Sequence, residues 1–136
     1  MNTSTQQFPY ATFLDVKFAP LELVDVPRVV GAVKDRWFNQ TLCKVNDSVV
    51  RLGVMQGEYH WHKHDHDDEL FFVLEGTFFV DLEDRSIELQ RWQGFTVPKG
   101  VVHRTRAPQR AVILMMETAA IVPTGDGEPN SANQSE

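Results

Sequence analysis

The stretch GEYHWHKHDHDDE, residues 57–69, holds four of the five histidines of the chain. They stand at every second position: His60, His62, His64 and His66. Side chains two residues apart on a β-strand share one face and lie about 6.5–7 Å apart. Two imidazoles at that separation can bind one ion, because each nitrogen needs to lie about 2.0–2.1 Å from it. The spacing predicts a strand with a metal-binding histidine face, and with Tyr59, Trp61 and Lys63 pointing the other way.

Two further residues can complete a coordination sphere around His62 and His64. Glu69 opens the next apolar run after a polar loop, so it can fold back beside the histidine pair. His103 follows the turn-forming residues 98–102, PKGVV. Three imidazoles and one carboxylate suit a single divalent transition metal: Fe, Mn, Zn, Ni or Cu. A histidine run alone has low specificity, however, and a solvated edge strand with surface carboxylates is the alternative.

The rest of the chain has the pattern of an all-β domain. Short apolar runs rich in Val, Phe, Ile and Leu are bounded by turn residues, which is typical of strands. These runs are residues 49–55, 70–74, 77–82, 86–89, 95–97 and 111–116. Residues 27–38 are either a helix that begins at Pro27 or an extended segment. Many short strands without helical alternation predict an all-β sandwich or barrel and argue against a βαβ fold.

Length and composition indicate one ordinary globular domain. The chain has 136 residues, of which 42% are hydrophobic and 24% charged, and its single cysteine excludes an intrachain disulfide. We expect one domain over residues 1–123, with residues 1–12 flexible, and a disordered tail over residues 124–136, which lack large apolar side chains.

Charge and hydropathy argue against nucleic acid and membranes as binding partners. The net charge is −6. The one small basic cluster, at Arg104, Arg106 and Arg110, is too small to bind along the phosphate backbone of a nucleic acid. No apolar run approaches the roughly 20 residues of a membrane span. The first residues lack the apolar core of a secretory signal. We therefore expect a cytoplasmic protein without nucleic-acid or membrane partners.

The histidine stretch and a second motif together resemble the two motifs of the cupin superfamily. The first runs from Gly57 through His62-Lys-His64 and Glu69 to Gly76. The second is GFTVPKGVVH, residues 94–103. The pair is most similar to small single-domain bacterial cupins, which are often labelled sugar-phosphate-isomerase-like. The resemblance implies a jelly-roll β-barrel. It also implies metal binding by the matching residues, His62, His64, Glu69 and His103.

Two positions depart from the family pattern. His60 stands where such sequences usually carry an apolar residue. It is therefore a candidate acid/base or substrate contact in the pocket, or else a polar residue at the barrel mouth. Ala107 stands where the family often has an asparagine that closes the second motif. That asparagine is not a metal ligand, so the predicted metal site is unaffected.

Glu58 and Glu117 belong to strands that can face the cavity. Each is either a catalytic base or a salt-bridged structural group.

Three functions are compatible with these features. The first is a metal-dependent enzyme acting on a small oxygenated organic molecule, with dioxygenase, lyase, cyclase and isomerase chemistry not separable. The second is a non-catalytic or metal-free module that binds a small molecule such as a sugar or metabolite. The third is a purely structural metal in a closed shell.

The apolar outer face of one predicted strand indicates self-association. If Glu69 faces inward, Leu70, Phe72 and Leu74 face away from the barrel. A contiguous apolar patch of that kind marks an interaction site. We therefore expect a homodimer that buries this face, with exchange of a strand from residues 13–23 as one way to form it.

Overall fold

The computed structural model describes residues 10–126, and these form eight strands and a short helix. In chain order the elements are β1 Tyr10–Phe13, α1 Val26–Gly31, β2 Trp37–Val45, β3 Ser48–Glu58, β4 Glu69–Glu75, β5 Phe78–Leu82, β6 Ser86–Leu89, β7 Gly94–Val97 and β8 His103–Thr118. All six predicted apolar runs lie within strands or begin one residue before one. β1 and β2 lie outside the predicted runs.

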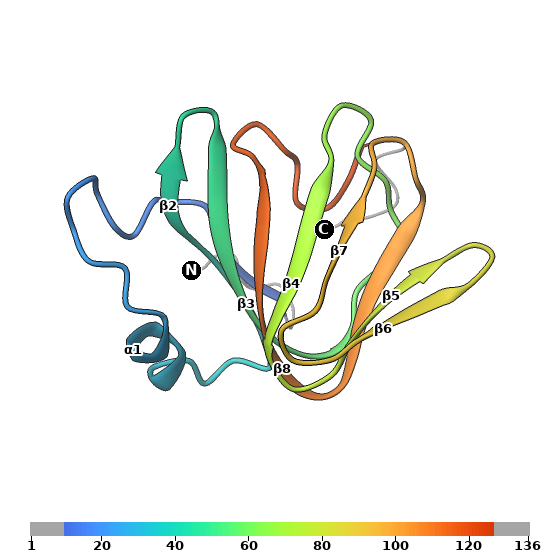
Figure 1. Cartoon of the computed structure of the whole chain (residues 1–136), viewed down its shortest axis with the longest axis horizontal. Helices are drawn as coiled ribbons and strands as arrows, with labels where there is room; N and C mark the ends of the chain where they lie inside the picture. Colours follow the sequence, from blue (N-terminus) through green and yellow to red (C-terminus); the bar gives the residue numbers. More distant parts are fainter. Residues whose placement is uncertain (1–9, 127–136) are drawn as a thin grey trace.

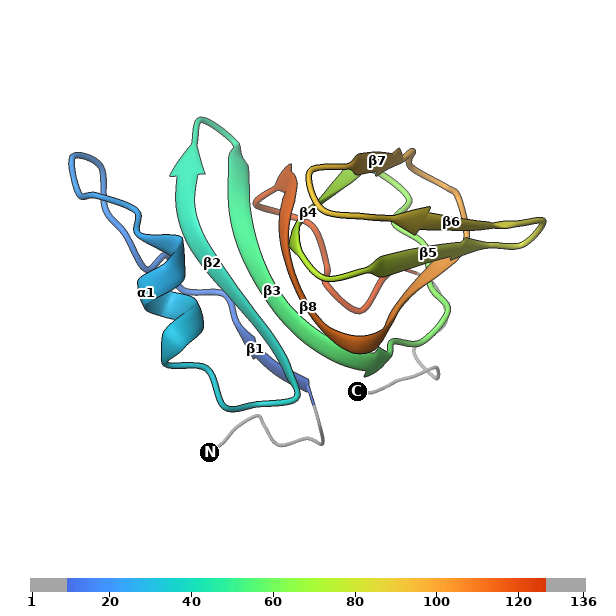
Figure 2. The same cartoon turned by 60° about the horizontal axis from the view of Figure 1, so that its bottom comes forward.

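The long strand β8 joins the two sides of a curled sheet (Figures 1 and 2). Hydrogen-bonded neighbours follow the order β1-β2-β3-β8-β4-β7, while β5 pairs with both β6 and β8. The first residues of β8 pair with β5, as in His103 opposite Leu82, and its later residues pair with β3 and β4. A strand shared in this way wraps the sheet around a common interior. The predicted all-β jelly-roll barrel is confirmed.

Residues two apart on the strands fill that interior. On β4, Glu69, Phe71 and Val73 are buried while the residues between them are half-buried, as expected for a strand with one face on the core. The interior cluster consists of Trp37, Met55, Phe71, Val73, Phe78, Val80, Leu89, Val97, Ala107, Ala111, Ile113 and Met115. Glu69 therefore projects into the barrel on the same face as Phe71 and Val73.

Helix α1 covers part of the outer face of the sheet. Asp25 caps its first turn by accepting from the Arg28 amide, and a proline occupies an early position where its missing N–H costs nothing. Val29 packs with buried residues of β2, β3 and β8, namely Leu42, Leu52, Val54 and Val112. The two alternatives for residues 27–38, a helix or an extended segment, each hold for part of the range, because the helix ends at Gly31 and β2 begins at Trp37.

The segment before α1 lies along the open edge of β2. Within residues 13–23, Phe13 alone belongs to a strand, and the following chain is irregular. The amides of Lys17 and Phe18 donate to the carbonyls of Thr41 and Leu42. The predicted strand over residues 13–23 is therefore wrong, and strand exchange and the homodimer stay predictions. Residues 1–9, most of the segment predicted to be flexible, lie outside the described residues.

The described part of the chain ends beside the histidine segment. Residues 124–126 are folded, because Asp126 pairs with Lys63 in an isolated bridge. The predicted tail therefore begins too early, and its remaining residues, 127–136, lie outside the described part. Among residues 10–126, no helix is long and apolar enough to cross a membrane.

Candidate metal centre

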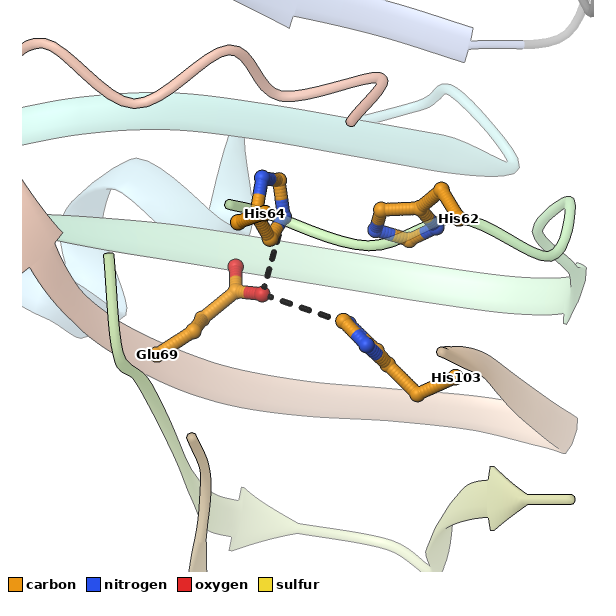
Figure 3. Close-up of side chains that lie close together, drawn as sticks. All are labelled: His62, His64, Glu69 and His103. Carbon is orange, nitrogen blue, oxygen red and sulfur yellow. Dashed lines mark ion pairs between the residues drawn. The ribbon is translucent and has the colours of Figure 1, made fainter. Parts of the chain in front are cut away.

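The four predicted ligands converge at one point inside the barrel (Figure 3). One donor atom from each of His62, His64, Glu69 and His103 lies within 4.8 Å of the others. His62 and His64 come from the segment between β3 and β4, Glu69 begins β4 and His103 begins β8. Two backbone hydrogen bonds, of 2.9 and 2.8 Å, set His62 directly opposite His103. The topology thus brings together residues from three separate parts of the sequence.

The distances around Glu69 match ligands of a shared ion better than hydrogen bonds. Its Oε1 lies 3.4 Å from Nε2 of His64 and 3.5 Å from Nε2 of His103. Charge-assisted hydrogen bonds are shorter, about 2.7–2.9 Å. Two donor atoms that each lie about 2.0–2.2 Å from one ion stand about 3.0–3.5 Å apart. The spacing in the barrel therefore fits a metal ion.

Several polar atoms of the cluster are buried without a partner. Both ring nitrogens of His64, Nε2 of His103 and Oε1 of Glu69 have no hydrogen-bond partner within residues 10–126. Each such atom costs about 1–3 kcal/mol of stability unless something satisfies it. A cation bound by all four residues would satisfy Oε1 of Glu69, Nε2 of His103 and one of the two nitrogens of His64. The donor set and its burial therefore fit the metal that the resemblance implies.

Backbone carbonyls set the tautomers of two of the rings. Nδ1 of His62 donates to the His60 carbonyl, and Nδ1 of His103 donates to the Val101 carbonyl, both at 2.9 Å. Because a carbonyl only accepts, Nδ1 carries the proton and Nε2 keeps its lone pair. Such bonds orient metal-binding imidazoles and fix which nitrogen binds.

The surroundings also give these side chains the charge states that a metal needs. Burial, reinforced by the neighbouring His103, lowers the pKa of His62 to about 3. Burial alone would raise the pKa of Glu69, but the imidazoles of His103 and His64 hold that pKa well below its usual range. At neutral pH the centre therefore presents a neutral His62 and an ionised carboxylate.

The lowered pKa of His62 predicts a loss of stability in acid for the metal-free protein. Unfolded histidine titrates near pH 6.5, so below this pH the unfolded chain binds a proton that folded His62 refuses down to about pH 3. Stability is therefore fully present above pH 6.5 and falls below it. Between pH 7 and pH 5 we expect His62 to cost on the order of 2 kcal/mol.

Chemical denaturation of EDTA-treated wild type and a His62→Gln variant at both pH values measures this cost. The difference between the two proteins isolates His62 from other groups that titrate in the same range. Parallel pH profiles for the two proteins would contradict the predicted shift.

The histidine segment does not keep the alternation of a regular strand. Its residues 62 and 63 form only isolated bridges, because the chain bulges between Met55 and Gly57 and bends at Gly57, where φ is +116°. Trp61 is exposed as predicted, but Tyr59 lines the cavity, so its predicted outward orientation is wrong. His60 donates from Nε2 to the Thr124 carbonyl at 2.8 Å and lies outside the cavity lining. His66 is exposed.

A small cavity of about 30 Å³ adjoins the centre within the barrel. It is lined by Thr12, Trp37, Asn39, Met55, Tyr59, His62, Glu69, Phe71, Thr105, Met115, Glu117 and Pro123. Glu117 faces it as predicted. Glu58 does not, because its exposed side chain pairs with Arg104 at 3.2 Å.

Arg51 is a buried charged residue that the sequence analysis missed. It pairs with Glu117 at 2.9 Å, and both side chains are 3% exposed. Burial and the adjacent Glu69 carboxylate raise the pKa of Glu117, while the Arg51 guanidinium opposes that rise. The available signal was a charged residue inside an apolar strand, on the same face as Val49, Gly53 and Met55.

Barrel and site together define a class: a jelly-roll protein in which three imidazoles and one carboxylate could hold a metal ion. The profile of the family described as "Cupin domain" matches residues 48–117, more than half of the chain. The chain belongs to the cupin domain family, as the sequence resemblance predicted.

Bacterial proteins are among its relatives. The chain is 43% identical over 90 residues to YdbB of Bacillus subtilis, spanning 65% of this chain and 80% of YdbB. It is 41% identical over 59 residues to SchB of Streptomyces halstedii, spanning 43% of this chain and 41% of SchB.

Solved structures agree with the fold. A cupin-2 domain protein of Shewanella frigidimarina superposes with a TM-score of 0.68 at 29% identity, covering 71% of this chain and 94% of that one. Protein NMB1881 of Neisseria meningitidis superposes with a TM-score of 0.65 at 26% identity, covering 71% and 99%.

Proposed function

We propose that this chain binds one divalent transition metal through His62, His64, Glu69 and His103, and that it is a metal-dependent enzyme acting on a small oxygenated organic molecule. The observation that carries the proposal is the convergence within 4.8 Å of four donor atoms, three of them from buried residues. Burying such polar groups without a cation would be costly, since their hydrogen-bonding capacity is otherwise wasted.

Backbone and side-chain groups of the site would have different roles in such an enzyme. The carbonyls of His60 and Val101 hold two imidazoles with Nε2 directed at the centre. Apolar side chains from the cavity lining, such as Trp37 and Phe71, restrict water. A bound divalent ion would supply Lewis-acid polarisation of a substrate oxygen, or redox chemistry if it were iron.

The size of the cavity favours a second candidate, a metal with a purely structural role. About 30 Å³ holds one or two water molecules and is far below the roughly 300 Å³ of an ordinary ligand site. A closed coordination shell would then tie β4, β8 and the histidine segment together. A module that holds an intact sugar would need a larger interior than this one.

Binding of azide to cobalt-substituted protein separates the enzyme from the structural site. An enzyme needs an exchangeable coordination position, so we expect azide to change the visible spectrum of the cobalt-loaded protein. Azide added to metal-free protein provides the baseline. A cobalt spectrum that stays constant up to high azide concentration would contradict a catalytic site and favour a closed structural shell.

A further inference from the structure

The end of the described chain returns to the segment that carries two of the candidate ligands. After β8 the chain turns back (Figure 1, red), and we name residues 119–126 the C-terminal strap. The amide of Asp126 donates to the Lys63 carbonyl at 2.6 Å, and its Oδ2 accepts from the Asp65 amide at 2.7 Å. These bonds attach the strap on both sides of His64 in the sequence.

Gly125 brings the strap directly onto His62. A Cβ atom at position 125 would lie 2.5 Å from Cβ and 3.0 Å from Cδ2 of His62, and φ of Gly125 is +94°. Real Cβ atoms do not approach that closely, and other residues strain at this φ. Glycine therefore allows the strap to cover His62, while Pro123 closes the neighbouring cavity wall.

His60 holds the strap at Thr124. Its Nε2 donates to the Thr124 carbonyl at 2.8 Å, and its ring stacks on Tyr59 with the centroids 4.3 Å apart. The histidine that departs from the family pattern therefore bridges the cavity wall and the strap.

The attachment of the strap is mostly polar and close to solvent. Ile121 is buried, but Val122 is 46% exposed. The side-chain bonds to Thr124 and Asp126 lie at exposed positions. Segments with few buried apolar contacts open at a low cost in free energy. The cavity holds only one or two water molecules, and Pro123 of the strap forms part of its wall, so detachment of the strap would enlarge it.

We propose that the C-terminal strap is a movable cover over the candidate metal centre, with His60, Gly125 and Asp126 as the positioning residues that hold it against His62. Metal exchange and ligand entry then require the strap to detach. The proposal rests on the proposed function for the metal, but the cover itself exists whether or not a metal is bound.

Three variants weaken the strap in different ways. Gly125→Ala forces it off His62, Asp126→Ala removes the acceptor for the Asp65 amide, and His60→Phe keeps an aromatic ring beside Tyr59 but loses the bond to Thr124. Gly31→Ala is the control, because a Cβ there would meet nothing within 4 Å and Gly31 ends helix α1, outside the strap and the histidine segment.

The first readout is the rate at which zinc-loaded protein releases its zinc to excess EDTA. We expect release about 10-fold faster in Asp126→Ala, the factor that one lost hydrogen bond to a charged group supports. Gly125→Ala should release zinc at least as fast. Zinc uptake should accelerate as well, so the dissociation constant changes less than either rate. Gly31→Ala should release zinc at the wild-type rate.

The second readout needs no metal. Diethylpyrocarbonate modifies accessible neutral imidazoles, and peptide mass spectrometry of EDTA-treated protein reports its reaction at His62. We expect faster modification in Gly125→Ala and Asp126→Ala than in the wild type. If these variants release zinc and undergo His62 modification at the wild-type rates, the proposal that the strap covers the centre is wrong. A wild-type protein that takes up no zinc would overturn the metal proposal alone, because the modification of His62 would still decide the strap.

Discussion

Removal of metal with EDTA is expected to lower the melting temperature of the wild-type protein by about 10 °C or more. A ligand that binds only the folded state adds about 4 kcal/mol when its free concentration exceeds Kd a thousandfold. For a domain of this size, each kcal/mol shifts the melting temperature by about 3–5 °C. Removing the metal also leaves the buried polar atoms of His64, Glu69 and His103 unsatisfied. Thermal unfolding followed by circular dichroism, with and without EDTA, measures the shift.

Two variants make this prediction specific to the candidate centre. The His62→Ala/His64→Ala protein should melt at one temperature with or without EDTA, because two of its four candidate ligands are gone. The His66→Ala protein should keep the full EDTA effect, since this exposed histidine belongs to the same run but lies outside the cluster. An equal EDTA effect in all three proteins would place the metal elsewhere.

The Arg51→Ala variant is expected to lose about 3–5 kcal/mol of unfolding free energy. Arg51 and Glu117 form a buried ion pair at 2.9 Å in the barrel interior. Removing the guanidinium leaves Glu117 buried beside the Glu69 carboxylate without its cation. The cost is large because Glu117 then either stays charged without a cation or takes up a proton at neutral pH, and the missing side chain also leaves a cavity. Urea denaturation at neutral pH measures the loss.

Removing both charges should cost much less than removing one. In Arg51→Met/Glu117→Leu, apolar side chains replace the pair, and such exchanges are often neutral or stabilising. Lys44→Ala, at an exposed position on β2, should change stability by no more than about 0.5 kcal/mol. A loss in Arg51→Ala no larger than in Lys44→Ala would contradict a structural role for the buried pair.

The fold was predictable where local pattern and packing agree. β3 and β4 were found because their apolar runs are compact and bounded by turn residues. β2 was not, because its sequence, WFNQTLCKV, interrupts the apolar residues with Asn39, Gln40 and Thr41. One face of β2 packs in the barrel interior and the other packs against the outer cluster with α1. Apolar residues are therefore needed on both faces, and the alternation of apolar and polar residues is weak.

The candidate ligands could be named from the sequence, but their surroundings could not. The ligands were identified from residue types at a characteristic spacing, so they could be predicted correctly even though the predicted strand geometry of the histidine segment was wrong. The orientations of Tyr59 and His60 depend on how the chain leaves β3 at Gly57, which a two-residue period does not contain.

The strap and the buried pair were missed for a different reason. Gly125 and Asp126 have the composition of a tail, and only contacts with His62, Lys63 and Asp65 give them a place in the fold. Arg51 likewise acquires its partner, Glu117, from a strand far along the chain. Such long-range partners are absent from any local pattern.

The metal content of the purified, tag-free protein tests the central claim most directly. Elemental analysis of wild type, His66→Ala and His62→Ala/His64→Ala compares proteins that differ only in the histidine run. We predict about one equivalent of a divalent transition metal in the first two proteins and background in the double variant. Background metal in all three, even after reconstitution with Fe, Mn, Zn, Ni or Cu, would contradict the account.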